Sequence, residues 1–365
     1  MAYRLFLLIF LFGLLKAEQK QPYLYNISRD NVGVWLNPPL QHDALTNKQN
    51  LNEVIKRIGS TFGTILWSQP SKMAIVGSGY DMLNDSLQMF PIMAASYNKF
   101  VSALNNTTFS NITLTNKTTG DSNTSKTVNV IMSFDVLPVP IHDDLKFHQY
   151  MELHHLIDEN MTIDTLNTKS LDGAKFLADY TNKLYNGTVD TLLLIDKDYL
   201  RRNYQYEAED IETRLEETLY SVKWARNVLT NQLGARDYKL GVLLSYRFFV
   251  DDTINLQTTY IKNETLMNVD VIVVATMHDD QFDDHWVELE NIVKIIEASD
   301  SMLRNLKLNA TIIPLIFCNR RSPFFQYDHI DYDFFNCWQY MNDWAVRNNR
   351  KIIMYEAIDH LGGRF

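Results

Sequence analysis

Eight short apolar runs, separated by polar and amphipathic stretches, constrain the fold of this chain more than any other feature. The runs cover residues 32–36, 64–68, 128–136, 189–196, 239–246, 269–277, 311–317 and 351–357. Most are continuously apolar, which is typical of strands that are buried on both faces of a parallel sheet. The sequence therefore predicts eight strands in this order, without an internal repeat.

Helical patterns lie between these runs. Apolar residues recur at helical spacing in residues 45–59, 209–233, 286–303 and 331–348, and a candidate cap and a glycine stop frame residues 172–187. Strands that alternate with helices predict an α/β fold, a single-domain (β/α)8 TIM barrel. A doubly wound open sheet with an attached domain is the competing fold. No G-x-G-x-x-G follows the first strand, which disfavours the nucleotide-binding version of that fold.

The N-terminal residues have the pattern of a secretory signal peptide. Arg4 precedes an apolar run from Leu5 to Leu15, and the small residue Ala17 follows. The run is too short to span a bilayer comfortably, which takes about 20 residues. We expect a signal peptide over residues 1–17, a mature barrel over residues 18–365, secretion, and no membrane association after cleavage.

Asn-X-Ser/Thr sequons support an extracellular glycoprotein. Five of them crowd into residues 105–125, a polar segment without apolar periodicity that we expect to form an exposed glycosylated loop. Residues 137–171 also lack clear periodicity, and we expect a long excursion around strand 3 there. The sequons begin at Asn26, Asn84, Asn105, Asn106, Asn111, Asn116, Asn123, Asn160, Asn186, Asn263 and Asn309.

Charge and cysteine content exclude several classes of function. The chain has 34 basic and 44 acidic residues, so a nucleic-acid partner, which needs a basic surface, is disfavoured. Cys318 and Cys337 could pair in an oxidising compartment or could both be buried thiols, and the sequence leaves both alternatives open. No His pair has strong ligand spacing, so we expect no metal and no other cofactor. The oligomeric state is not indicated.

Polar and aromatic residues follow the predicted strands. In barrels of this class, catalytic and binding groups lie at the C-terminal ends of the strands. Aromatic faces that stack on sugar rings, together with carboxylates and amides that bond hydroxyl groups, would suit a carbohydrate ligand. Strand-to-loop boundaries also become polar in any barrel, so this mixture is a weak signal. The candidate ligand-binding residues are Trp35, Asp135, Asp196, Tyr246, His278, Asn319 and Asp359.

Asp198 and Glu356 are the candidate catalytic pair. Glycoside hydrolysis usually uses two carboxyl groups, about 5–5.5 Å apart for retention or about 6.5–9.5 Å apart for inversion. Strands four and eight face each other across a barrel, so we expect the wider spacing. Glu356 lies in the predicted apolar strand 351–357, where burial would raise its pKa and favour a proton-donor role. A structural glutamate held by an arginine is the interpretation that we favour.

Several segments together resemble glycoside hydrolase family 18, the chitinases and chitinase-like lectins. The third strand, VNVIMSF, is similar to the third strand of that family, and GAKFLADYTNKLYNGTVDTLLLIDKD is similar to the segment that leads into its D-G-x-D-x-D-x-E motif. VDVIVVATMHDD, IPLIFCNRR and IIMYEAIDH are similar to its sixth, seventh and eighth strands. The resemblance covers most of the mature chain and implies a TIM barrel that handles sugars.

The catalytic residues of that family do not carry over. If Asp190 starts the motif, the later acids fall on Leu193 and Ile195 and the proton-donating Glu falls on Lys197. If Asp196 and Asp198 are instead the paired acids, the Glu falls on Leu200. The Tyr-Asp pair of strand six falls on Met277 and His278, and the Trp of strand eight falls on Glu356. The resemblance therefore implies a barrel that has lost its general acid.

The C-terminal segment also resembles glycoside hydrolase family 17, the β-1,3-glucanases. The similarity lies in YDHIDYDFFNCWQYMNDWA and MYEAIDH. The Asn-Glu of strand four would fall on Asp196 and Lys197, and the Glu of strand seven would fall near Asn319. Both resemblances imply a barrel with lost catalysis and disagree only on the sugar.

Three hypotheses follow for the function. The leading one is a secreted, glycosylated, chitinase-like barrel that is catalytically inactive and binds an oligosaccharide or a glycoprotein. The second is an active glycosidase of the chitin or β-1,3-glucan type that uses Asp198 and Glu356 as rearranged carboxylates. The third is a secreted structural or antigenic scaffold. A remodelled active site needs precise new geometry, which favours the first and the third.

Overall fold

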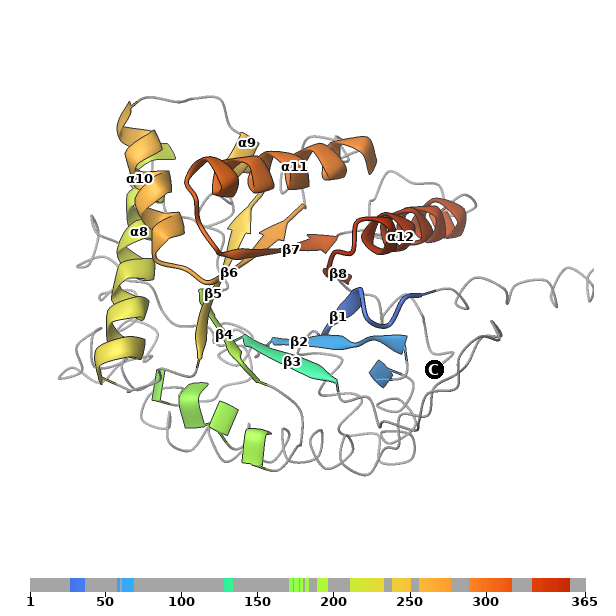
Figure 1. Cartoon of the computed structure of the whole chain (residues 1–365), viewed down its shortest axis with the longest axis horizontal. Helices are drawn as coiled ribbons and strands as arrows, with labels where there is room; N and C mark the ends of the chain where they lie inside the picture. Colours follow the sequence, from blue (N-terminus) through green and yellow to red (C-terminus); the bar gives the residue numbers. More distant parts are fainter. Residues whose placement is uncertain are drawn as a thin grey trace, which may run out of the picture.

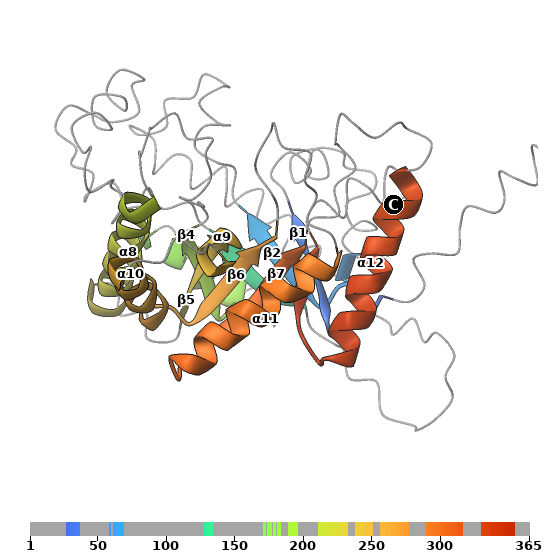
Figure 2. The ribbon, with the colours of Figure 1, turned by 90° about the horizontal axis from the view of Figure 1, so that it is seen from above.

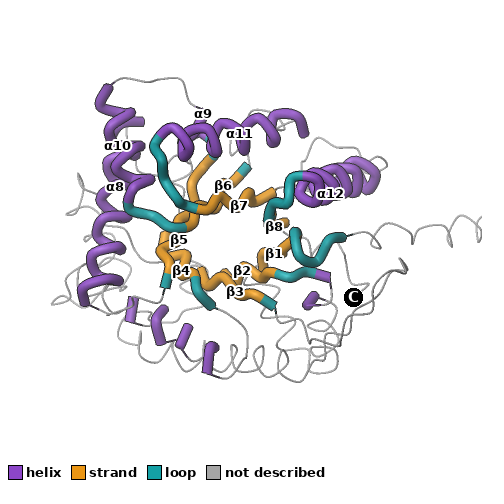
Figure 3. Tube along the Cα trace, in the orientation of Figure 1, coloured by secondary structure: helices purple, strands orange, loops and turns teal. Residues whose placement is uncertain are grey.

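Eight parallel strands close into a barrel in chain order, with β1 beside β8 (Figures 1 and 3). The predicted (β/α)8 barrel is therefore confirmed. The computed structural model describes residues 27–36, 58–59, 61–68, 128–133, 171–172, 174–176, 178–179, 181–183, 189–195, 211–232, 238–250, 256–276, 289–316 and 330–354.

Each of the eight predicted runs contains one strand. The strands are β1 (Val32–Leu36), β2 (Thr64–Ser68), β3 (Asn129–Ser133), β4 (Thr191–Ile195), β5 (Lys239–Ser245), β6 (Val271–Ala275), β7 (Thr311–Ile316) and β8 (Ile352–Met354). The prediction succeeds because both faces of a barrel strand are covered, one by the barrel interior and one by helices.

The first strand and the last strand close the ring. Val32 is paired with Ile352, and Val34 with Met354. The segment before β1 is tied to the C-terminal part of the chain, because the Asn31 side chain donates from Nδ2 to the carbonyl oxygen of Arg350 at 2.9 Å and the Ile352 amide donates to the carbonyl oxygen of Asn31 at 2.9 Å. Closure of the barrel thus depends on contacts between the segment just before the first strand and the segment around the last strand.

Helices form an outer layer around the barrel (Figure 2). They are α8 (Ile211–Asn227), which continues as a π-helical turn over Val228–Gln232, α9 (Arg247–Val250), α10 (Leu256–Met267), α11 (Leu289–Asn305) and α12 (Ile330–Arg347). The described residues between 171 and 183 are also helical. The helices predicted over 209–233, 286–303 and 331–348 are confirmed, whereas α9 and α10 were not predicted.

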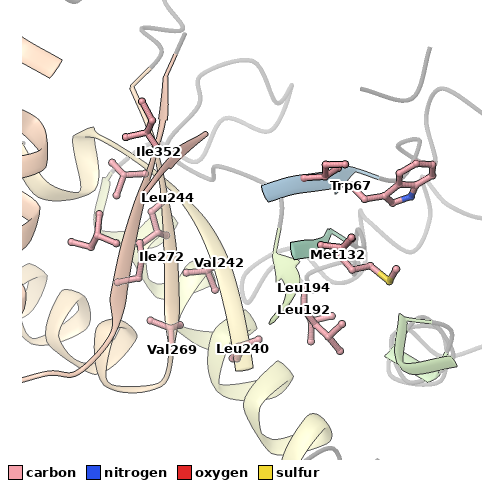
Figure 4. Close-up of a cluster of buried hydrophobic side chains, with 14 of the residues drawn as sticks. Trp67, Met132, Leu192, Leu194, Leu240, Val242, Leu244, Val269, Ile272 and Ile352 are labelled. Atoms are coloured by element: carbon pink, nitrogen blue, oxygen red, sulfur yellow. The ribbon is translucent and has the colours of Figure 1, made fainter. Parts of the chain in front are cut away.

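The outward side chains of the strands form the main core, between the barrel and its helices (Figure 4). Trp67 and Met132 extend from β2 and β3, and Leu240, Val242 and Leu244 alternate along β5. All five are at most 5% exposed. We call this layer the outer cluster.

None of the helices in the described part of the chain is both long enough and apolar enough to cross a membrane.

Candidate functional site

The C-terminal ends of all eight strands lie at one end of the barrel, because the strands are parallel and form a closed ring. We call this end the C-terminal rim, and it is where barrels of this fold place their binding and catalytic groups. The last residues of the strands there are Leu36, Ser68, Ser133, Ile195, Ser245, Ala275, Ile316 and Met354.

The barrel interior is filled with apolar side chains. Inward residues alternate with the residues of the outer cluster along each strand, as the two-residue period of a strand requires. They form a second cluster that we call the inner cluster: Leu66, Ile131, Leu193, Leu243, Val271, Val273, Ala275, Ile313, Leu315 and Ile353. Each is at most 7% exposed, so the interior is a packed core beneath the rim.

Strand β4 carries a leucine where the first alignment with the family 18 motif places an acid. Leu193 belongs to the inner cluster and is 0% exposed. It is paired with Ser133 of β3 on one side and with Gly241 of β5 on the other. No carboxylate lies between Thr191 and Ile195, and a carboxylate at position 193 would lie in the apolar inner cluster, with Ser133 as its paired polar neighbour.

Asp190, the first acid of that alignment, lies at the opposite end of the barrel. It precedes β4, and its carboxylate forms an ion pair of 2.9 Å with Lys239 Nζ at the start of β5. The Thr191 hydroxyl donates to Asp190 Oδ1 at 2.9 Å. Burial raises the pKa of Asp190, but hydrogen bonds from Lys239 and Thr191 and the charge of Lys239 outweigh it, leaving the pKa below its ordinary value. Asp190 therefore fastens β4 to β5.

This ion pair predicts a small pH-dependent loss of stability. Because the folded-state pKa of Asp190 is lowered, the pair stabilises the fold above the ordinary carboxyl pKa, and this contribution disappears as the pH falls through the lowered value. Both side chains are about half exposed, so we expect Asp190→Asn to cost about 0.5 kcal/mol at pH 7. Urea unfolding at several pH values should show this difference shrinking below about pH 4. A difference that stays constant with pH would contradict the assignment.

Trp35 is the candidate ligand-binding residue that the structure places on the inner side. It is the penultimate residue of β1, it is partly buried, and its side chain packs against the inner cluster. Tyr246 instead packs against the outer cluster. The Tyr246 amide donates to the carbonyl oxygen of Ala275 at 3.0 Å, and its own carbonyl oxygen accepts from the Phe249 amide at 3.0 Å, so this residue links β5 to α9.

Two serines at the rim were missed as candidates. Ser133 and Ser245 end β3 and β5, the strands on either side of β4, and are 0% and 4% exposed. Each follows an inner-cluster residue by two positions, so the strand period alone places both on the inner face.

The pairing of β4 with β5 also shifts register between Leu193 and Ile195. Such bulges are over-represented at barrel rims and next to active sites.

The other predicted site residues lie outside the described residues. They are Asp135, Asp196, Asp198, His278, Asn319, Glu356, Asp359 and Cys318. Cys337 is in α12, but its side chain is not described. Among the sequons, Asn263 lies in α10 and Asn309 is exposed before β7, whereas the other nine and the excursion at 137–170 lie outside the described residues. Among described residues, no group of three His, Cys, Asp or Glu could hold a metal.

Comparison with known proteins supports the fold. No family model matches the chain, and no curated protein sequence matches it. An endo-laminarinase from Formosa Hel1_33_131 superposes with a TM-score of 0.53 and 12% identity, over 90% of this chain and 78% of that one. A GH18 chitinase from Pseudoalteromonas aurantia superposes with a TM-score of 0.35 and 10% identity, over 91% and 96% of the two chains. At 12% identity, the first similarity shows a shared barrel fold.

Proposed function

We propose that this chain is a secreted, glycoside-hydrolase-like barrel that binds an oligosaccharide, free or on a glycoprotein, at its C-terminal rim and does not hydrolyse it efficiently. The observation that carries the proposal is the composition of β4, where Leu193 occupies the inner face at a position that the motif of the resembled family gives to an acid. The partly buried indole of Trp35 supplies an aromatic face on the inner side of β1.

The missing acid bears directly on chemistry. In the resembled family, the substrate's own N-acetyl group attacks the anomeric carbon while one glutamate protonates the leaving oxygen. Position 197 is a lysine, and position 200 is a leucine, so neither alignment supplies this proton donor. General acid catalysis typically contributes about 10²–10⁴-fold to the rate. Without it, hydrolysis of a bound sugar would be slower by about this factor, and the site would act mainly as a receptor.

Trp35 and Trp67 form a matched pair that tests sugar binding. They occupy neighbouring strands, with Leu36 paired to Trp67, but Trp35 packs on the inner cluster and Trp67 on the outer cluster. We expect Trp35→Leu to weaken binding of chitohexaose or laminarihexaose by about tenfold, because a stacked aromatic face is lost, which corresponds to about 1.4 kcal/mol. Isothermal titration calorimetry on the purified full chain measures this change.

Trp67→Leu is the control, because it removes a similar volume from the other side of the barrel wall. It should lower the melting temperature and leave the dissociation constant unchanged. Equal losses of affinity in both variants would mean that the fold, and not an inner aromatic face, supports binding. If the wild-type chain binds neither oligosaccharide, the scaffold hypothesis replaces the proposed function.

A further inference from the structure

Helix α10 exposes large apolar side chains on the face that points to solvent. Its outer face carries Leu256, Tyr260 and Met267, which are 92%, 55% and 55% exposed. These residues are spaced by four and seven positions, so they form one continuous row along the helix. We call this row the α10 stripe. Large apolar side chains in a contiguous exposed row mark a surface that another group covers.

The core of the protein does not need this stripe. The opposite face of α10 is the buried one, made of Thr258, Ile261, Lys262, Thr265 and Leu266. Helix α10 lies beside α8 in both ribbon views (Figures 1 and 2). An ion pair of 2.9 Å between Lys223 of α8 and Glu264 holds the two helices together at the edge of their contact. The stripe therefore points away from the barrel.

Asn263 lies within the stripe and begins the sequon Asn263-Glu264-Thr265. It follows Tyr260 by three residues and precedes Met267 by four, so it shares their face of the helix, where it is partly exposed. Helical side chains lean toward the N-terminus of their helix and cover the turn before their own Cα atom. A group attached to Asn263 would accordingly extend over Tyr260, which lies about 4.5 Å away along the helix axis.

We propose that Asn263 carries an N-linked glycan whose first N-acetylglucosamine packs on Tyr260 and covers the α10 stripe. The Asn263 side-chain nitrogen forms a bond to the anomeric carbon of a lipid-pyrophosphate-linked oligosaccharide. The bond from that carbon to the pyrophosphate breaks, one amide proton is released, and the lipid pyrophosphate leaves. This inference rests on the proposed function in one respect, because the modification requires entry into the secretory pathway.

Modification must precede folding of α10. Thr265, the third residue of the sequon, is 0% exposed, and its hydroxyl donates to the carbonyl oxygen of Ile261 at 2.8 Å. The folded helix thus removes the sequon hydroxyl from solution, and the sugar is transferred to the nascent chain. Asn309 differs, because both it and Thr311 are exposed at the start of β7. Asn309 serves as the internal control.

A sugar fits the stripe better than a protein partner does. Asn263, which can be glycosylated, lies in the middle of the stripe. A glycan attached to it would keep a flat protein surface from binding the stripe. One face of a pyranose ring presents C–H groups that pack on an aromatic ring, and its hydroxyl groups remain in water. The glycan would thereby convert an apolar helix face into a hydrated surface, which matches the solubilising role of surface glycans.

Site occupancy is the first test. The full chain is expressed in secreting eukaryotic cells, and glycopeptides from the medium are analysed by mass spectrometry after enzymatic deglycosylation in heavy-oxygen water. We expect label on both Asn263 and Asn309. Heavy-oxygen label on Asn309 together with an unmodified Asn263 would overturn this inference, whereas the proposed secretion of the chain would stand. Retention of an unmodified chain inside the cell would instead contradict the proposed secretion, and this inference with it.

Self-association is the second test and probes the packing on Tyr260. Asn263→Gln should strengthen self-association about tenfold in sedimentation velocity experiments, because the stripe becomes uncovered. Asn309→Gln should leave it unchanged, and Asn263→Gln with Tyr260→Ser should return it to the wild-type value. Deglycosylation of the folded wild-type protein should reproduce the first result if Asn263→Gln is poorly secreted. The inference would be overturned if the glycosylated wild-type protein formed dimers and Tyr260→Ser abolished them. The stripe would then bind a second copy of the chain.

Discussion

Leu193→Asp should leave no folded protein. Leu193 is 0% exposed within the inner cluster, and the residues paired with it on β3 and β5 are Ser133 and Gly241. An ionised carboxylate there would lose its hydration without a charged partner among the described residues of the inner cluster, and a protonated one would still lose the packing of a leucine. We expect a loss above about 4 kcal/mol, which is comparable to the whole stability of many domains.

The control for this prediction is Leu193→Met, which roughly conserves volume and should cost less than about 1.5 kcal/mol. Circular dichroism, size-exclusion chromatography and urea unfolding of the three proteins provide the comparison. The substitution also bears on function, because an aspartate at position 193 is what the first alignment with the acidic motif requires. A stable Leu193→Asp protein would mean that β4 does not present Leu193 to a packed interior.

Alanine substitutions at three glycines should destabilise the barrel in the order Gly63, Gly33 and Gly241. A Cβ atom at Gly63 would be driven into the carbonyl oxygen of Arg29. At Gly33 it would lie 2.8 Å from the carbonyl oxygen of Thr64, and at Gly241 3.1 Å from the Thr191 methyl group. Backbone atoms yield less than side-chain methyl groups, so we expect losses of about 3, 2 and 1 kcal/mol.

The backbone near Arg29 cannot move aside easily. The Arg29 side chain donates from Nε to the carbonyl oxygen of Gly59 at 2.7 Å, and the Ser28 amide donates to Asn342 Oδ1 at 2.8 Å. Relief of the overlap at Gly63 would break bonds to both the preceding helical segment and α12. Urea unfolding gives the three free energies, and an inverted order would contradict the register at which β1, β2 and β8 meet.

The strands could be predicted from sequence because their physical requirement is simple. A parallel barrel strand is covered on both faces, so β6 and the central residues 240–244 of β5 carry no polar side chain. Helix α10 was missed because both of its faces are mixed. Ile261 and Leu266 are buried beside Thr258, Lys262 and Thr265, whereas Leu256 and Tyr260 are in solvent. Its apolar residues lie on both faces, so the assignment of apolar residues to the core does not single out the buried face.

The candidate site was predictable only in part. The position of Trp35 near the end of a strand identified it as a rim residue, and the structure adds that its ring packs on the inner cluster. Tyr246 has the same sequence context, yet it packs on the outer cluster, because it lies in the turn between the end of β5 and the start of α9. Inward and outward positions differ by a single residue, so they cannot be assigned until the strand register is known.

Product formation from bound sugar tests the central claim most directly, since the claim is that the barrel binds oligosaccharides without cleaving them. The purified full chain is incubated with chitohexaose and with laminarihexaose at concentrations that saturate binding, and shorter oligosaccharides are quantified by mass spectrometry over time. The account predicts binding with no product above a buffer control. Steady release of shorter sugars, abolished by Glu356→Gln or Asp198→Asn, would contradict it and establish a working glycosidase with rearranged carboxylates.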